Sequence, residues 1–271
     1  MKVIFHYSYP ISVDIDTDKQ VDIYIDQVPV GDVPEGAIRI VMLEEPKKGL
    51  LFNYVQQNQD SYTHLLTFHE ELLTTIPKAI RFHNLNTWVK GYISPQKNFS
   101  VSTVVGGKRD VVMEGYALRH NLWKNKDRIT IPKRFYLSGT AKNAHVFRPW
   151  RGAVYRGQLV LGASKTPMFD SMFHIAIENT SIKHYFSEKV LDCFHTKTVP
   201  IYYGCKNIEE FFNPAGMFRV SGVEEIVQVC NQLTPEVYER MLPVVEENYE
   251  LSHQYCDHEQ QIKDIIVKII S

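Results

Sequence analysis

FHIAIENTSIKHYFSEKVLDCFHTKTVPIYYG, residues 173–204, is the stretch that decides the fold. Residues 173–177 form an apolar run typical of a buried strand, and residues 178–185 are polar and turn-forming. A helix is expected to start at Ser187, and the β-branched and aromatic residues 199–203 predict a second strand. The stretch therefore predicts strand, loop, helix and strand, which is the repeating unit of an α/β fold.

The loop before this helix has the features of an anion-binding site. The first N–H groups of a helix have no partner within the helix, and together with the helix dipole they favour a negative charge at the N-terminus. Lys189 lies in the first helical turn, where the dipole opposes a cation unless an anion compensates it. We therefore predict that this loop and helix start hold an anionic group.

Length and composition narrow the class of protein. A chain of 271 residues suits two α/β halves or one large domain, and an apolar content of 44% is ordinary for a globular core. The formal net charge of -1 argues against a nucleic-acid-binding protein. The four cysteines have no zinc spacing, so we expect buried thiols in a reducing compartment.

The N-terminus MKVIFHYSYP does not have the charged and apolar regions of a signal peptide. No window approaches about 18 uninterrupted apolar residues, so we predict no transmembrane helix. The expectation is a soluble cytoplasmic protein.

The first hundred residues predict a parallel sheet with little helix between its strands. The expected strands are residues 2–7, 22–25, 37–43, 64–68 and 79–82. The third strand ends at Glu44, Glu45 and Pro46, and the proline prevents further pairing. Ligands of open α/β sheets bind at such carboxyl ends, so the two glutamates could belong to a site. The alternative is that they are two solvated glutamates at the start of a loop.

A second sheet is expected after a linker at residues 94–98. Its first strand, residues 99–105, is followed by two glycines, Lys108 and Arg109, which could cradle a phosphate or form a flexible exposed turn. A helix over 114–123 carries Arg119 near its start, as a phosphate ligand or a surface arginine. A strand is expected over 128–136. The basic, aromatic segment 140–157 is either a surface loop or part of a substrate rim.

The C-terminal residues predict three helices. They cover 223–231, a segment that begins at Thr234 and Pro235 and is kinked or ended at Pro243, and a last segment capped by Asp257. The isoleucines of the last helix form an apolar stripe that must pack on another element. The predicted organisation is residues 1–95 as the first domain, 96–255 as the second, and 256–271 as a helix that packs back on the first.

The stretch 178–204 closely resembles the C-terminal signature of the family 10 glycosyltransferases, the α1,3/α1,4-fucosyltransferases, in their short microbial or viral form. The family pattern is an Asn, a Tyr six residues later, Ser/Thr-Glu-Lys, a helix, and a strand of the type T-[IV]-P-[IV]-Y/V-x-G. The positions that match in register are Asn179, Tyr185, Ser187, Glu188, Lys189, Thr198, Pro200 and Gly204. Weaker similarity extends to the segments that contain Glu45 and Arg119.

The resemblance implies a GT-B fold, with two Rossmann-like domains and a donor cleft between them. It implies an inverting transfer of fucose from GDP-fucose to a hydroxyl of a glycan acceptor, without a required metal. The resemblance further implies a catalytic base, a set of donor ligands and a set of alternates. The catalytic base is Glu45, with Glu44 as the second choice. The diphosphate is bound by Arg119 and Lys189 with the help of Asn179 and Tyr185, and the ribose by Glu188. The alternates are Glu178, which either positions the sugar or the loop or is a structural carboxylate, and Lys108 and Arg109, which would replace Arg119.

Two other functions are compatible with the same residues. A transferase of this architecture could use another nucleotide sugar, because nothing in the sequence recognises guanine or fucose directly. A sugar-binding protein without catalytic activity could also keep the fold, although the retained glutamate and lysine of the signature argue against it.

Overall fold

The structure is a computed structural model of the full chain, and it divides into two compact units. The first contains Met1–Asn86, Lys183–Tyr185 and Asp257–Ser271, and the second contains Thr87–Ile182 and Phe186–Cys256. The structure describes residues 3–6, 15, 17–29, 31–83, 85–89, 92, 96–108, 110, 112–138, 159–160 and 164–271. Part of the predicted linker at 94–98, the segment 140–157 and Arg109 lie outside the described residues, wholly or in large part.

The first unit is a five-stranded sheet in the order β1-β2-β3-β4-β5, with every pair parallel. Its elements are β1 (Val3–His6), β2 (Val21–Ile25), β3 (Ile38–Leu43), α1 (Leu50–Gln57), β4 (His64–Thr67), α2 (Glu70–Thr75), β5 (Ala79–Arg81) and α8 (His258–Ile270). The prediction of a parallel sheet with short intervening helices is confirmed.

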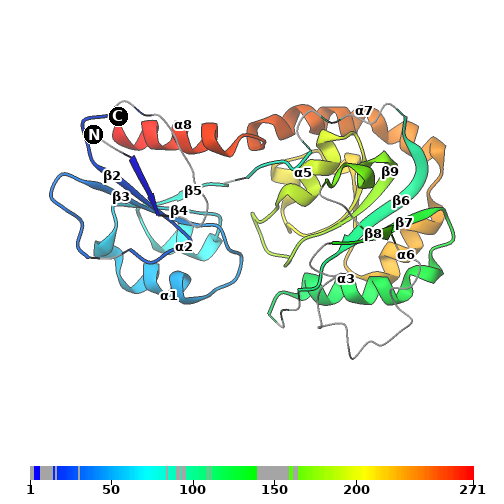
Figure 1. Cartoon of the computed structure of the whole chain (residues 1–271), viewed down its shortest axis with the longest axis horizontal. Helices are drawn as coiled ribbons and strands as arrows, with labels where there is room; N and C mark the ends of the chain where they lie inside the picture. Colours follow the sequence, from blue (N-terminus) through cyan, green and yellow to red (C-terminus); the bar gives the residue numbers. More distant parts are fainter. Residues whose placement is uncertain are drawn as a thin grey trace. The chain divides into compact units, whose positions relative to one another are not determined.

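Both faces of this sheet are apolar, and each packs against helices. On one face Ile23 and Ile40 join a buried cluster with Ile262 and Ile266 of α8. On the other face Val41 and its neighbours pack against Phe52 and Val55 of α1 and Leu72 of α2. Because side chains alternate along a strand, these two clusters form the two sides of one three-layer core (Figure 1).

The second unit is a six-stranded parallel sheet in the order β11-β10-β9-β6-β7-β8. Its strands are β6 (Asn98–Val105), β7 (Lys133–Leu137), β8 (Leu159–Val160), β9 (Ser171–Ile177), β10 (Val199–Tyr203) and β11 (Phe218–Arg219). Its helices are α3 (Glu114–Asn125), α5 (Glu188–His195), α6 (Val223–Gln232) and α7 (Pro235–Ser252). The helices α5 and α7 cover one face, and α3 and α6 lie on the other (Figure 1).

The strand order of the second unit reverses between β6 and β9. Chain order runs outward from β6 through β7 to β8 on one side, and from β9 through β10 to β11 on the other. This is the doubly wound arrangement, in which ligands bind at the carboxyl ends of the two strands where the order reverses. The predicted strand, loop, helix and strand are β9, the loop 178–187, α5 and β10.

One prediction about these elements is wrong in detail. The strand expected over 128–136 begins only at Lys133, because Arg128 lies in a 3-10 helix, Lys126–Arg128, and Pro132 cannot donate to a ladder. Of the two outcomes predicted for Pro243, an end of the helix is excluded, since α7 continues to Ser252, and a kink stays a prediction. Pro243 is exposed, so water can bond the carbonyl that it leaves without an N–H partner.

The predicted caps are present: Thr234 accepts a hydrogen bond from the N–H of Val237, and Asp257 from that of Gln260.

All four cysteines are described, are buried and form no disulfide. Within the described residues, every helix is too short or too polar to cross a bilayer.

Candidate functional site

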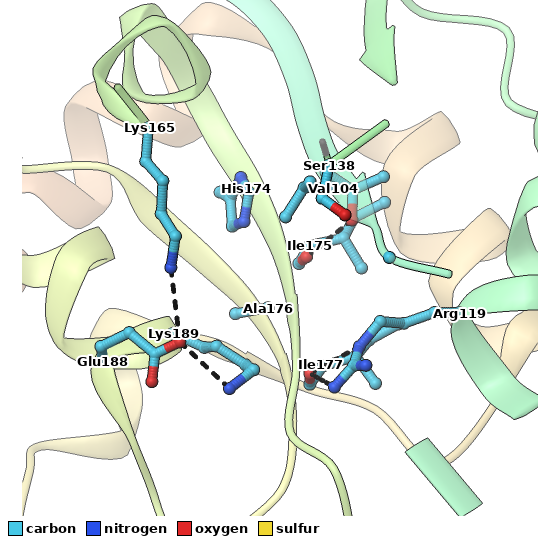
Figure 2. A pocket seen from close by; sticks show the side chains of 12 residues that line it. Val104, Arg119, Ser138, Lys165, His174, Ile175, Ala176, Ile177, Glu188 and Lys189 are labelled. Carbon is cyan, nitrogen blue, oxygen red and sulfur yellow. Dashed lines mark hydrogen bonds and ion pairs between the residues drawn. The ribbon is translucent and has the colours of Figure 1, made fainter. Parts of the chain in front are cut away.

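A cavity of about 190 Å³ lies in the second unit where the strand order reverses (Figure 2). Its walls come from the carboxyl halves of β6 and β9, from α3 and from the start of α5. The lining residues are Thr103, Val104, Gly106, Arg119, Ser138, Lys165, His174, Ile175, Ala176, Ile177, Glu188 and Lys189. Three of the predicted site residues, Arg119, Glu188 and Lys189, are therefore brought together from two separate helices.

Glu178 fixes the start of α5 through hydrogen bonds to Ser187. Its carboxylate is fully buried and accepts hydrogen bonds from the Ser187 N–H (2.9 Å, to Oε1) and hydroxyl (2.6 Å, to Oε2). Space for it exists because residue 204 is glycine, where a Cβ would lie 2.5 Å from the Glu178 Cγ. Burial raises the pKa of Glu178, while Lys189, with its Nζ at 3.6 Å, acts in the opposite direction. Glu178 thus sets the geometry of the helix N-terminus.

Glu188 stands between two lysines at the cavity wall. Its Oε1 lies 3.2 Å from the Lys189 Nζ and 3.4 Å from the Lys165 Nζ. Burial favours the neutral acid, but the two ammonium groups outweigh it and lower the pKa of Glu188 to about 2. Burial likewise opposes the charge on Lys189, and Glu188 and Glu178 reverse this, so that the pKa of Lys189 is raised. Glu188 is therefore ionised and Lys189 is protonated at neutral pH.

Arg119 reaches the cavity from the second turn of α3 and is only 9% exposed. Its Nε and Nη2 donate to the Ile177 carbonyl at 3.1 and 2.9 Å, and Nη2 also donates to the Asn179 Oδ1 at 2.7 Å. The close approach of α3 to this loop requires Gly115, where a Cβ would lie 1.8 Å from the Glu178 carbonyl oxygen. Asn179 therefore contributes by orienting the guanidinium.

The described lining of the cavity carries three cations, Arg119, Lys165 and Lys189, against the single carboxylate of Glu188. Such a surplus of positive charge beside a helix N-terminus favours an anionic ligand, and the planar guanidinium suits a phosphate. Among the described residues no group of three or more His, Cys, Asp or Glu side chains could hold a metal ion.

Tyr185 is not among the residues that line this cavity. It belongs to the first unit, where its buried ring lies 5.3 Å from that of Phe68. Its predicted contact with the donor stays a prediction.

Glu44 and Glu45 follow β3 in the first unit. The N–H groups of both bond the Asp26 Oδ1, at 2.9 and 3.3 Å, and His69 Nε2 lies 3.0 Å from the Glu45 carbonyl oxygen. Burial raises the pKa of Asp26. These contacts fix the backbone and leave the Glu45 carboxylate exposed, and its role as the base stays a prediction.

Lys108 is exposed, and its carbonyl oxygen lies 3.2 Å from the Nε2 of His120, whereas Gly106 just before it lines the cavity. Sequence reasoning did not identify the two other ionisable side chains of the lining, Lys165 and His174. The alternation of side chains on a strand could have found His174, since residues 174 and 178 share a face of β9 and its continuation. No comparable pattern marks Lys165.

The two parallel sheets give the chain a fold of the GT-B type, and comparison with solved structures agrees. The crystal structure of TarM matches 93% of this chain with 12% identity and a TM-score of 0.60, and the chain spans 55% of the length of TarM. An α1,3-fucosyltransferase with GDP matches 97% of this chain and 81% of its own, with 16% identity and a TM-score of 0.56. The α1,3-fucosyltransferase with GDP-fucose covers 88% and 80%, with 13% identity and a TM-score of 0.51.

A family model matches a large part of the second unit. Residues 156–257 match the profile "Glycosyltransferase family 10 (fucosyltransferase) C-term". The matched residues include the signature around Glu188 and Lys189 on which the resemblance to this family rests. No curated protein matches the sequence.

Proposed function

We propose that the second unit binds a nucleotide sugar and that the chain transfers the sugar to a hydroxyl of a glycan acceptor. The observation that carries the proposal is the arrangement of Arg119, Lys189 and Glu188 around one cavity at the reversal of strand order. Arg119 and Lys189 hold the diphosphate, and Glu188 accepts hydrogen bonds from the ribose hydroxyls.

The same cations serve the chemistry. Negative charge develops on the diphosphate as it leaves, and fixed donors that face this charge lower the barrier. The orientation of Arg119 is set in advance by the Ile177 carbonyl and the Asn179 side chain, so little reorganisation is needed during the reaction. The acceptor hydroxyl attacks the anomeric carbon with inversion, and Glu45 takes its proton. This reaction needs no metal.

GDP-fucose is the donor that we propose, because the family 10 domain and the α1,3-fucosyltransferase with GDP-fucose both point to it. A second candidate is a UDP-sugar. A S. aureus TarM variant in complex with Fondaparinux, alpha-GlcNAc-glycerol and UDP matches 92% of this chain, with 11% identity and a TM-score of 0.58.

Titration calorimetry with GDP, UDP and ADP tests the donor. Tighter binding of GDP is expected, and tighter binding of UDP would transfer the proposal to the second candidate. Turnover of GDP-fucose with a panel of glycan acceptors then tests the reaction. A protein that binds GDP but releases no fucose to any acceptor or to water would be a binding protein.

Glu45→Gln tests the base, with Glu44→Gln as the matched control from the same strand end. Loss of a general base typically costs about 10²- to 10⁴-fold in rate. We expect such a loss in kcat for Glu45→Gln with unchanged GDP affinity, and a much smaller loss for Glu44→Gln. Equal turnover by wild type and Glu45→Gln would remove Glu45 from this role.

A further inference from the structure

His174 is a buried polar side chain of the cavity to which the proposed function gives no role. It is 4% exposed, lies on β9 and lines the cavity (Figure 2). Arg119 contacts the carbonyl of Ile177, which lies three positions further along the strand from His174, a rise of about 10 Å. In Figure 2 Arg119 and Lys189 lie on either side of Ile177 in the lower part of the view, and His174 lies above Ala176, toward Lys165.

The contacts of Ser102 fix the tautomer of His174. The Ser102 Oγ lies 2.7 Å from the Met168 carbonyl oxygen and 2.7 Å from the His174 Nδ1. Two oxygens at 2.7 Å need a hydrogen between them, and a carbonyl can only accept, so the single hydroxyl hydrogen goes to Met168. The imidazole must then donate from Nδ1, which leaves Nε2 with a lone pair.

The ring stays neutral, because burial and the nearby Lys165 and Lys97 lower the pKa of His174 to about 3. Nε2 has no hydrogen-bond partner within the described part of the chain, and it is not sealed from the cavity. A buried acceptor of this kind is costly unless a donor meets it. The cavity therefore offers a fixed neutral acceptor to a ligand.

We propose that His174 Nε2 accepts a hydrogen bond from the nucleoside half of the donor, from a base N–H or a ribose hydroxyl. The inference rests on the proposed function, since it assumes that Arg119 and Lys189 hold the diphosphate. Glu188, the proposed ribose ligand, lines the same cavity as His174. His174 then contacts the nucleoside, which Arg119 and Lys189 do not contact.

His174→Phe tests the proposal, because it keeps the size of the ring and removes the acceptor. His174→Gln is the matched variant, since its amide oxygen can replace Nε2. Calorimetry uses GDP, or UDP if wild type binds that more tightly, and pyrophosphate as a ligand without a nucleoside. An unsatisfied buried partner predicts roughly 5- to 100-fold weaker nucleotide binding by the Phe variant, a smaller loss for Gln, and unchanged pyrophosphate binding.

Base-methylated and deoxyribose analogues of the nucleotide identify the donor group. The analogue that lacks it binds wild type and His174→Phe equally weakly, whereas the others keep the difference. Wild-type nucleotide affinity in His174→Phe overturns the inference, as does an equal loss for pyrophosphate. If no analogue binds wild type more weakly than the parent nucleotide does, the inference also fails. This measurement uses wild-type protein only, so it does not depend on whether the variant folds. Failure of wild type to bind any nucleotide would instead refute the proposed function.

Discussion

Lys189 is the residue whose removal tests the proposed anion site most directly. Its Nζ lies 3.2 Å from the Glu188 Oε1, 3.6 Å from the Glu178 Oε2 and 3.0 Å from the Ser187 Oγ. Lys189→Met keeps most of the side chain's length and removes its charge. A hydrogen bond to a charged group contributes about 1.5–3 kcal/mol, and each 1.4 kcal/mol changes affinity tenfold. We expect the dissociation constant for GDP to rise roughly 10- to 100-fold.

The variant should also acquire a pH dependence that wild type lacks. Lys189 is the largest influence that favours the ionised forms of Glu178 and Glu188, so its loss raises the pKa of both carboxyls. Two carboxylates without their lysine repel a diphosphate, and protonation relieves that repulsion as the pH falls. The defect in GDP affinity should therefore be smaller at pH 5 than at pH 8.

Calorimetry at the two pH values measures both effects. The matched control is Lys197→Met, since Lys197 is in the same unit, pairs with Glu246 at 2.9 Å and does not line the cavity. The control should change GDP affinity less than about twofold, as expected for an exposed ion pair. Wild-type affinity in Lys189→Met, or an equal loss in Lys197→Met, would refute the assignment of Lys189 to the phosphate site.

Two further variants follow from the structure. In Arg119→Lys the ammonium group cannot donate to the Ile177 carbonyl and the Asn179 side chain at the same time with the geometry of the guanidinium. The affinity for GDP should therefore fall roughly tenfold. Calorimetry that finds no change would exclude Arg119 from the site. Asp192→Asn should remove a pH dependence of stability. Burial, opposed by hydrogen bonds from Thr87 and Trp88, raises the pKa of Asp192 from 3.8 to about 7. The stability from this shift is present below about pH 4 and is lost as the pH rises through 7, at most about 4 kcal/mol. Thermal unfolding at pH 5 and pH 8 should show a larger decrease in wild type than in Asp192→Asn, and equal decreases would contradict the reasoning.

Local signals in the sequence predicted the second unit well. The apolar run before Glu178, the cap at Ser187 and the strand before Gly204 are each visible within a few residues. The position of Glu188 in the first helical turn follows from the same pattern. Features of this kind depend on short-range spacing, which a sequence displays directly.

Features that depend on distant segments were not predictable in the same way. Lys165 meets Glu188 only because the 3-10 helix Thr166–Asp170 and α5 border the same cavity. The burial of Tyr185 against Phe68 joins residues more than a hundred positions apart in the chain. At Pro243 a local rule allows a kink or an end, and α7 continues past it with Tyr238 and Val245 buried on either side.

The presence of two glutamates in an anion site is explained by the lysine that they hold. A lysine in the first turn of a helix is disfavoured by the dipole, and burial further opposes its charge. Glu188 and Glu178 overcome both effects and fix the ammonium group at one place in the cavity wall. A positioned cation does not have to be ordered when the ligand arrives, so less of the interaction energy is spent on immobilising a flexible side chain. The acidic residues therefore strengthen anion binding through Lys189, and this is the reason that removal of the lysine should convert them into a barrier to the same ligand.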